Sequence, residues 1–181
     1  MNIYISCAQC INQSTDLIDK RDFQFYKVNV NENGLYKFTC YKGHETMAIS
    51  PYDKYEILFQ MGANALLDGY YFEAVSCFAA SVERFREWCI RFFWSLNGIE
   101  ESEIKKVWGK LKRSEPQSGA FHSMYLNHFK VAPPIFNGNR DKFRNNVIHN
   151  GLIPNYNSAH DFGNYAFDLF TFTSKKNIPR I

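Results

Sequence analysis

Residues 71–96 read YFEAVSCFAASVERFREWCIRFFWSL, and this stretch decides the fold class. Its apolar side chains recur at spacings of three and four, which places them along one side of a helix. They are Ala74, Cys77, Phe78, Val82, Phe85, Cys89, Phe92 and Phe93. An apolar stripe of this length and breadth predicts a long buried helix, in which Cys77 and Cys89 are unreactive thiols.

Glycine, asparagine and proline residues divide the sequence on either side of this stretch into further helices. We expect them at about 52–67, 102–111, 119–130, 140–149 and 158–174, with a loop over residues 114–119. Ser50 is expected to cap the first of these helices, and Pro51 to occupy its first position. The pattern predicts a mainly α-helical domain over residues 51–181, a bundle of four to five main helices.

Residues 1–50 have a different pattern, in which short β-branched and aromatic runs are separated by polar residues. The runs Ile3–Ile5, Phe23–Val30 and Leu35–Thr39 predict strands. Asn31–Gly34 would join the last two strands as a hairpin, because Asn and Gly adopt the positive φ that such a turn requires. We therefore expect a small β-rich module ahead of the helices.

Four candidate metal ligands lie in this module. Cys7 and Cys10 form C-x-x-C, and Cys40 with His44 forms C-x-x-x-H after the predicted hairpin. Two ligand pairs from two tight turns are typical of a four-coordinate zinc site, and so small a module has little core of its own. We expect a zinc-ribbon-like module over residues 1–50 with one structural Zn²⁺ per chain and no open coordination position for catalysis. Unligated thiols and a surface histidine are the alternative.

The composition is that of a soluble globular protein. Of 181 residues, 45% are hydrophobic and 22% are charged, and 17 Phe, 11 Tyr and 3 Trp argue against disorder. A net charge of +3 is too small to indicate a nucleic-acid or membrane binder by bulk electrostatics, so an anion would need a local patch. Without a membrane-length apolar run or a signal-peptide pattern, we expect a cytoplasmic protein with no membrane contact.

One segment combines a cation, an amide and an imidazole. Residues 140–151 read RDKFRNNVIHNG. Asn145 and His149 are four positions apart and share a helix face, and Arg144 can reach the same point. A guanidinium binds phosphate oxygens, an imidazole moves protons near neutral pH and an amide orients a substrate, so the trio suits a phosphodiester. A histidine that interacts with the helix dipole, beside a surface arginine, is the alternative.

The segment from Arg144 to His149, with four intervening residues, resembles the hallmark of the HEPN family of small helical-bundle proteins. The turn at Asn150–Pro154 is similar to the one that commonly follows in that family. The stretches Gly69–Ala74 and Ala79–Arg84 are similar to the family's entry into its long second helix. The resemblance covers about residues 52–175 and leaves out the zinc-ribbon-like module. It implies a HEPN-like domain over residues 51–181.

This resemblance implies a specific chemistry. Many HEPN proteins are metal-independent endoribonucleases that act as homodimers, with the Arg and His of both subunits in a shared cleft. Carried over, His149 would be the general acid or base, Arg144 would stabilise the charged phosphorane, and Asn145 would position the phosphate or the imidazole. RNA cleavage would then leave a 2′,3′-cyclic phosphate without a catalytic metal. Glu83 is a candidate for a buried partner of Arg144, with an ordinary exposed helix charge as the alternative.

Other HEPN proteins imply other functions. Some are toxins held by an antitoxin, and by this resemblance the chain would act in a toxin or phage-defence system with an antitoxin or regulatory partner. Others are binding modules, so the second hypothesis is a non-catalytic adaptor that dimerises and docks a protein or nucleic acid. An adaptor could keep Arg144 and His149 in buried hydrogen bonds, whereas a catalytic pair lies open in a cleft. Lys105–Arg113 either tracks an RNA backbone with Trp108 stacked on a base, or is a solvated face with Trp108 packed inward.

Overall fold

The computed structural model of the chain describes residues 1–13, 24–133 and 139–174. The chain divides after Asp53 into an N-terminal unit, Met1–Asp53, and a helical unit, Lys54–Ile181. Phe23, where the second predicted strand begins, lies outside the described residues. The prediction of a mainly helical fold preceded by a small β-rich segment is confirmed.

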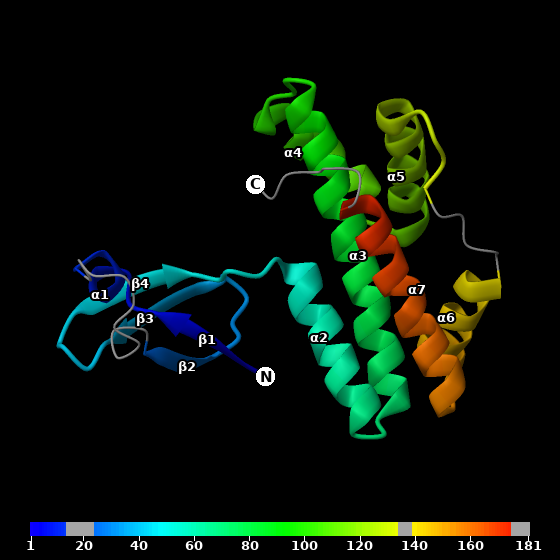
Figure 1. Ribbon diagram of the computed structural model, residues 1–181. Helices are drawn as coiled ribbons and strands as arrows, with labels where there is room; N and C mark the ends of the chain where they lie inside the picture. Colours follow the sequence, from blue (N-terminus) through cyan, green and yellow to red (C-terminus); the bar gives the residue numbers. More distant parts are fainter. Residues whose placement is uncertain (14–23, 134–138, 175–181) are drawn as a thin grey trace. The chain divides into compact units, whose positions relative to one another are not determined.

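The N-terminal unit contains two small antiparallel sheets and one short helix (Figure 1). Strand β1, Asn2–Ser6, pairs with β2, Phe25–Asn29, and β3, Leu35–Thr39, pairs with β4, Glu45–Ile49. Helix α1, Ala8–Gln13, follows β1. Side chains alternate between the two faces of a strand, so only a few of them reach the interior. The buried apolar residues outside the cysteine cluster are Ile3, Ile5 and Tyr36.

The predicted hairpin between β2 and β3 is wrong, because these strands lie in different sheets. The hairpin of this unit joins β3 to β4 through the turn from Cys40 to His44. In that turn the Gly43 N–H donates to the Cys40 carbonyl over 2.8 Å, and the Cys40 N–H donates to the His44 carbonyl over 3.0 Å. Gly43 has φ +82°, which glycine adopts without strain. Two of the candidate ligands, Cys40 and His44, therefore close this hairpin. The sequence analysis predicted neither β4 nor α1.

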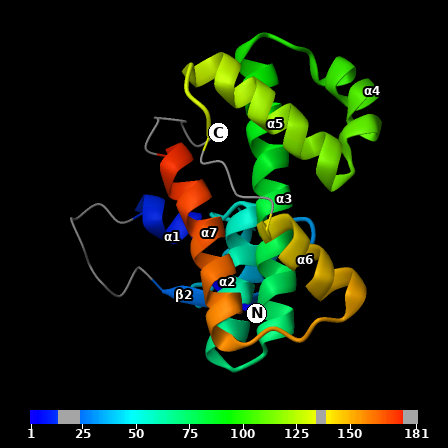
Figure 2. The ribbon, with the colours of Figure 1, turned by 90° about the vertical axis from the view of Figure 1, so that its right-hand side faces the viewer.

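Helix α3, Tyr71–Leu96, is the centre of the helical unit, and its bounds are those predicted. It contacts every other described helix of this unit. These are α2 (Lys54–Leu67), α4 (Glu101–Leu111), α5 (Ser114–Phe129), α6 (Asn139–Asn150) and α7 (Tyr156–Ser174). Helices α2, α6 and α7 lie beside one half of α3, and α4 and α5 lie toward its C-terminal end (Figures 1 and 2).

The starts of α2 and α7 differ from the prediction by two residues and that of α5 by five, whereas α4 and α6 begin within one residue of it. Helix α2 begins at Lys54, because the Ser50 hydroxyl accepts from the Tyr52 N–H over 3.1 Å in a local turn and does not cap a helix at Pro51. Helix α5 begins at Ser114, so the predicted loop over residues 114–119 is helical. Pro116 fits there because the first turn of a helix does not use its N–H groups in intrahelical hydrogen bonds.

The core of the helical unit lies along the apolar stripe of α3, where Phe78 is 1% exposed. Helices α2 and α7 approach this ring closely at glycines. A Cβ atom on Gly62 would lie 2.7 Å from the Phe78 ring, and one on Gly163 would lie 2.8 Å from it. The absence of a side chain at these two positions therefore sets how closely the three helices pack.

Three smaller expectations concern single residues and membrane contact. Trp108 is 9% exposed and lies under the guanidinium of Arg91, 4.5 Å from the ring centroid, so the inward-packed alternative is confirmed. Burial raises the pKa of the Cys89 thiol well above its ordinary value, as expected for an unreactive thiol. Of the helices in the described ranges, none has both the length and the apolar character needed to cross a bilayer.

Candidate functional site

The four predicted metal ligands meet in the N-terminal unit. Cys7 precedes α1, Cys10 lies in α1, and Cys40 and His44 bound the turn between β3 and β4. Their ligand atoms all lie within 4.8 Å of one another. Cys10 Sγ is 3.7 Å from Cys40 Sγ and 3.5 Å from His44 Nδ1. Cys7 Sγ is 3.8 Å from His44 Nδ1.

These distances fit a tetrahedral zinc ion. Bonds of about 2.3 Å to sulfur and about 2.0 Å to nitrogen put two sulfurs about 3.8 Å apart, and a sulfur and a nitrogen about 3.5 Å apart. The three cysteines are free thiols with at most 4% of their surface exposed. This cluster can hold a metal ion, and its donor set is compatible with structural zinc.

Thr46 of β4 supports the cluster, although no sequence signal indicates it. Its hydroxyl lies 3.0 Å from Cys7 Sγ, and the residue is 7% exposed. Burial acts to raise the pKa of Cys7, but hydrogen bonds with Thr46, the Cys10 backbone and His44 outweigh it and lower this pKa to about 6. A hydroxyl that donates to a thiolate is the kind of contact that supports metal-bound sulfur.

Cys10 is in the opposite electrostatic situation. Burial raises the pKa of Cys10 to about 11, and its hydrogen bonds and charge interactions with Cys7 and Cys40 add to the rise. A divalent cation reverses this effect because it binds the thiolate form.

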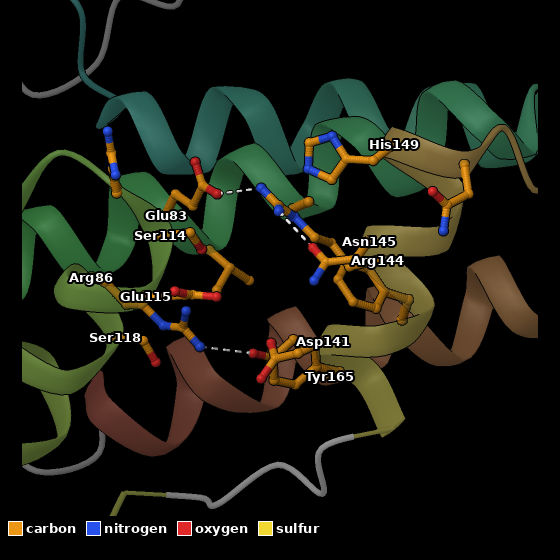
Figure 3. A pocket seen from close by; sticks show the side chains of 15 residues that line it. Glu83, Arg86, Ser114, Glu115, Ser118, Asp141, Arg144, Asn145, His149 and Tyr165 are labelled. Atoms are coloured by element: carbon orange, nitrogen blue, oxygen red, sulfur yellow. Dashed lines mark hydrogen bonds and ion pairs between the residues drawn. The ribbon is translucent and has the colours of Figure 1, made fainter.

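The second site is a cleft of about 690 Å³ in the helical unit, lined by α3, α5, α6 and α7 (Figure 3). From α3 it receives Ala79, Val82, Glu83 and Arg86, which share one helix face at spacings of three and four. From α6 it receives Arg144, Asn145 and His149. The cleft therefore brings together the three residues that the sequence singles out for phosphodiester chemistry.

Glu83 holds Arg144 in place. Arg144 Nη2 donates to Glu83 Oε1 over 2.6 Å, and Arg144 Nη1 donates to Asn145 Oδ1 over 2.9 Å (Figure 3). The two ion-paired side chains are 21% and 25% exposed, so water screens the pair only in part. The candidate pairing of Glu83 with Arg144 is therefore present, in a part-buried and not a fully buried form. A guanidinium with five N–H donors keeps donors available for a phosphate beyond these two contacts.

His149 lies open to the cleft. Its side chain is exposed, and the structure gives its ring no hydrogen bond or ion pair with any of the residues it describes. Asn145, four residues earlier, contacts Arg144 and not the imidazole. The amide thus orients the guanidinium, and the imidazole is available to exchange a proton with a bound molecule.

Arg86 is the functional candidate that the sequence analysis did not single out. It is 5% exposed, and its Nη2 donates to the Tyr165 hydroxyl over 3.2 Å. Burial raises the pKa of Tyr165 more than the charge of Arg86 lowers it, so the phenol is neutral. Arg86 lies four positions after Val82 and three before Cys89, inside the apolar stripe of α3. A charged residue at such a position is the sequence feature that could have identified it.

Comparisons of the chain with protein-family models, with curated proteins and with solved structures give no significant match. The geometry of the two sites therefore carries the functional argument.

Proposed function

We propose that the chain is a metal-independent endoribonuclease of the HEPN type, with Arg144 and His149 as its catalytic pair. The observation that carries this proposal is that both residues line one open cleft, where Arg144 is held by Glu83 and the His149 ring is unengaged among the described residues. An adaptor that used the pair only for structure would gain from burying both side chains in hydrogen bonds.

The proposed reaction is an internal transesterification of RNA. The 2′-oxygen forms a bond to phosphorus while His149 takes its proton, and the bond from phosphorus to the 5′-oxygen breaks. The leaving oxygen receives a proton, so the products are a 2′,3′-cyclic phosphate and a 5′-hydroxyl. Arg144 donates to the phosphoryl oxygens, whose negative charge grows in the transition state. DNA is resistant because it lacks the 2′-OH.

The reaction moves two protons, whereas the residues that line the cleft include one imidazole, that of His149. A second copy of the chain would supply the second imidazole at a shared cleft, as the HEPN resemblance implies. We therefore propose a homodimer, and sedimentation of the wild-type protein together with cleavage by mixed wild-type and His149→Ala chains tests it. A toxin or phage-defence role with a partner protein follows from the resemblance alone and stays a prediction.

We further propose that zinc occupies the cluster of Cys7, Cys10, Cys40 and His44, one ion per chain. Four protein ligands leave no position for an activated water, so the ion has a structural role. Metal analysis of purified protein, compared with a Cys40→Ser variant, tests its identity and stoichiometry.

The decisive experiment incubates the protein with labelled mixed-sequence RNA and with matched DNA. EDTA is added just before the assay, so that the N-terminal unit has little time to lose metal. The bound metal is measured in parallel to check this. We expect RNA-only cleavage that survives EDTA and falls about 10²- to 10⁴-fold in His149→Ala, because a positioned acid or base contributes that much. His160→Ala is the matched control, since the His160 side chain of α7 is 45% exposed and does not line the cleft.

Two outcomes would contradict the proposal. Equal activity of the wild type and His149→Ala would point to a contaminating nuclease. Inactivity of both proteins across several RNAs would favour the adaptor.

Glu83 provides a second test, as a positioning residue. Glu83→Gln removes the charge that holds Arg144, and we expect kcat to fall about 10- to 100-fold with a smaller change in KM. Glu73→Gln, an exposed carboxylate on the same helix, should leave both constants unchanged. An equal loss in both variants would mean that charge on α3, and not the position of Arg144, governs the rate.

A further inference from the structure

Arg86 is a buried cation that finds no counter-ion among the residues that the structure describes. Within the described ranges, no carboxylate lies at ion-pair distance from it, and its one hydrogen-bond acceptor is the neutral Tyr165 hydroxyl. Its Nε is buried with no hydrogen-bond partner. Burying an unpaired charge is costly. Arg86 is 5% exposed and lines the cleft. Its guanidinium is therefore suited to pair with an anion that enters the cleft.

The start of α5 adds further donors for an anion. This helix has 16 residues, and no side-chain hydrogen bond caps its N-terminus at Arg113. The first N–H groups of a helix lack intrahelical partners and lie at the positive end of its dipole. Ser114, the first residue of α5, lines the same cleft as Arg86. In Figure 3 both lie toward one end of the cleft, and Arg144 and His149 lie toward the other.

Helix α3 relates these donors to the catalytic pair. Glu83, which holds Arg144, and Arg86 are three residues apart on the face that lines the cleft. Their backbones are therefore about 4.5 Å apart along the helix axis. We propose that Arg86 and the N-terminus of α5 bind a second phosphate of the RNA strand, adjacent to the scissile phosphate at Arg144. This inference rests on the proposed function and adds a substrate subsite to it.

Two acidic residues also line the cleft, Glu115 and Asp141. Both are exposed, so water screens their charges, whereas Arg86 is buried. Asp141 gives the proposal a direction that can be measured. If Arg86 binds a phosphate, Asp141→Asn removes a repulsion and tightens RNA binding. If Asp141 were the working counter-ion of Arg86, the same change would weaken binding.

The experiment uses short RNA strands with one ribonucleotide among 2′-O-methyl residues, which defines the scissile phosphate. A neutral methylphosphonate replaces the neighbouring phosphate on either side, one position at a time. For the wild type we expect kcat/KM to fall roughly 10- to 100-fold at one of these positions, because a charge-assisted hydrogen bond is lost. For Arg86→Met we expect kcat/KM to be reduced already with the unmodified strand, and to fall no further with the methylphosphonate strand.

Control variants separate this subsite from general charge effects. Arg84→Met removes an arginine of the same helix that pairs with Glu87 and does not line the cleft, so it should keep the wild-type response. Asp141→Asn gives the same test if Arg86→Met does not fold, with tighter binding expected. A wild type that cleaves charged and neutral strands equally, or an Arg86→Met variant that keeps the wild-type response, would overturn the subsite.

A binding measurement separates failure of the subsite from failure of the nuclease function. Fully 2′-O-methylated strands cannot be cleaved, and their affinity is measured by fluorescence anisotropy. If no RNA is cleaved but affinity still depends on both Arg86 and the neighbouring phosphate, the phosphate site stands and the proposed function fails. If cleavage depends on His149 but neither rate nor affinity depends on Arg86, the proposed function stands and the subsite fails.

Discussion

The two units of this chain show opposite solutions to stability. Outside the cysteine cluster, the buried apolar residues in the described part of the N-terminal unit are Ile3, Ile5 and Tyr36. The helical unit packs a continuous core of aromatic and aliphatic side chains around α3. With the proposed ion bound, stability in the first unit is concentrated at the cluster of Cys7, Cys10, Cys40 and His44, whereas in the second it is distributed over many contacts.

Metal removal should have the largest effect, because it should destabilise the N-terminal unit and not the helical unit. Apparent binding free energies of structural zinc are about 10–16 kcal/mol, more than so small a core supplies. Prolonged chelation, or Cys10→Ala, should unfold the N-terminal unit and leave the thermal transition of the helical unit in place. Calorimetry and amide NMR spectra measure the two units separately, and Cys77→Ser is the control because Cys77 lies outside the cluster. A metal-free N-terminal unit that stays folded would contradict this account.

A single added methyl group should test the distributed core of the helical unit. Gly62→Ala places a Cβ 2.7 Å from the buried Phe78 ring, so we expect it to destabilise the unit by about 1–3 kcal/mol. Gly109→Ala in α4 meets nothing within 4 Å and should stabilise by about 0.5–1 kcal/mol, because alanine favours the helix. Denaturant unfolding of both variants measures this difference. A neutral Gly62→Ala would mean that the three helices can move apart without loss.

A local effect, smaller than that of metal removal, should come from the hydroxyl that supports the cluster. Thr46→Val keeps the shape of the side chain and removes its contact with Cys7 Sγ, so we expect metal affinity to fall about 10- to 100-fold. Thr46→Ser keeps the hydroxyl and should remain close to the wild type. Competition with a chromophoric chelator measures both affinities. If serine and valine had the same effect, packing and not the hydrogen bond would explain the role of Thr46.

Most helices of the helical unit were predictable because they have local signals, whereas α1 of the N-terminal unit and the first turn of α5 were not. The spacing of apolar residues in 71–96 predicts α3 with its observed bounds, and Asn150–Gly151 marks the end of α6. Strand pairing was not predictable in the same way. The turn at Asn31–Gly34 satisfies every local rule for a hairpin, yet β2 pairs with β1, because pairing is decided by contacts far apart in the chain.

The candidate sites likewise combine features that the local sequence predicts with contacts that depend on the tertiary structure. The sequence by itself determined the types of the candidate metal ligands and the placement of Arg144 and His149 on one helix, since both depend on short spacings. Only the tertiary structure decided that Glu83 holds Arg144, that Thr46 contacts Cys7, and that Arg86 lines the cleft. These contacts join residues from different elements, and only packing brings them within hydrogen-bond distance. Burial has the same origin, and it turns an ordinary arginine of α3 into a cation that lacks a counter-ion within the described structure.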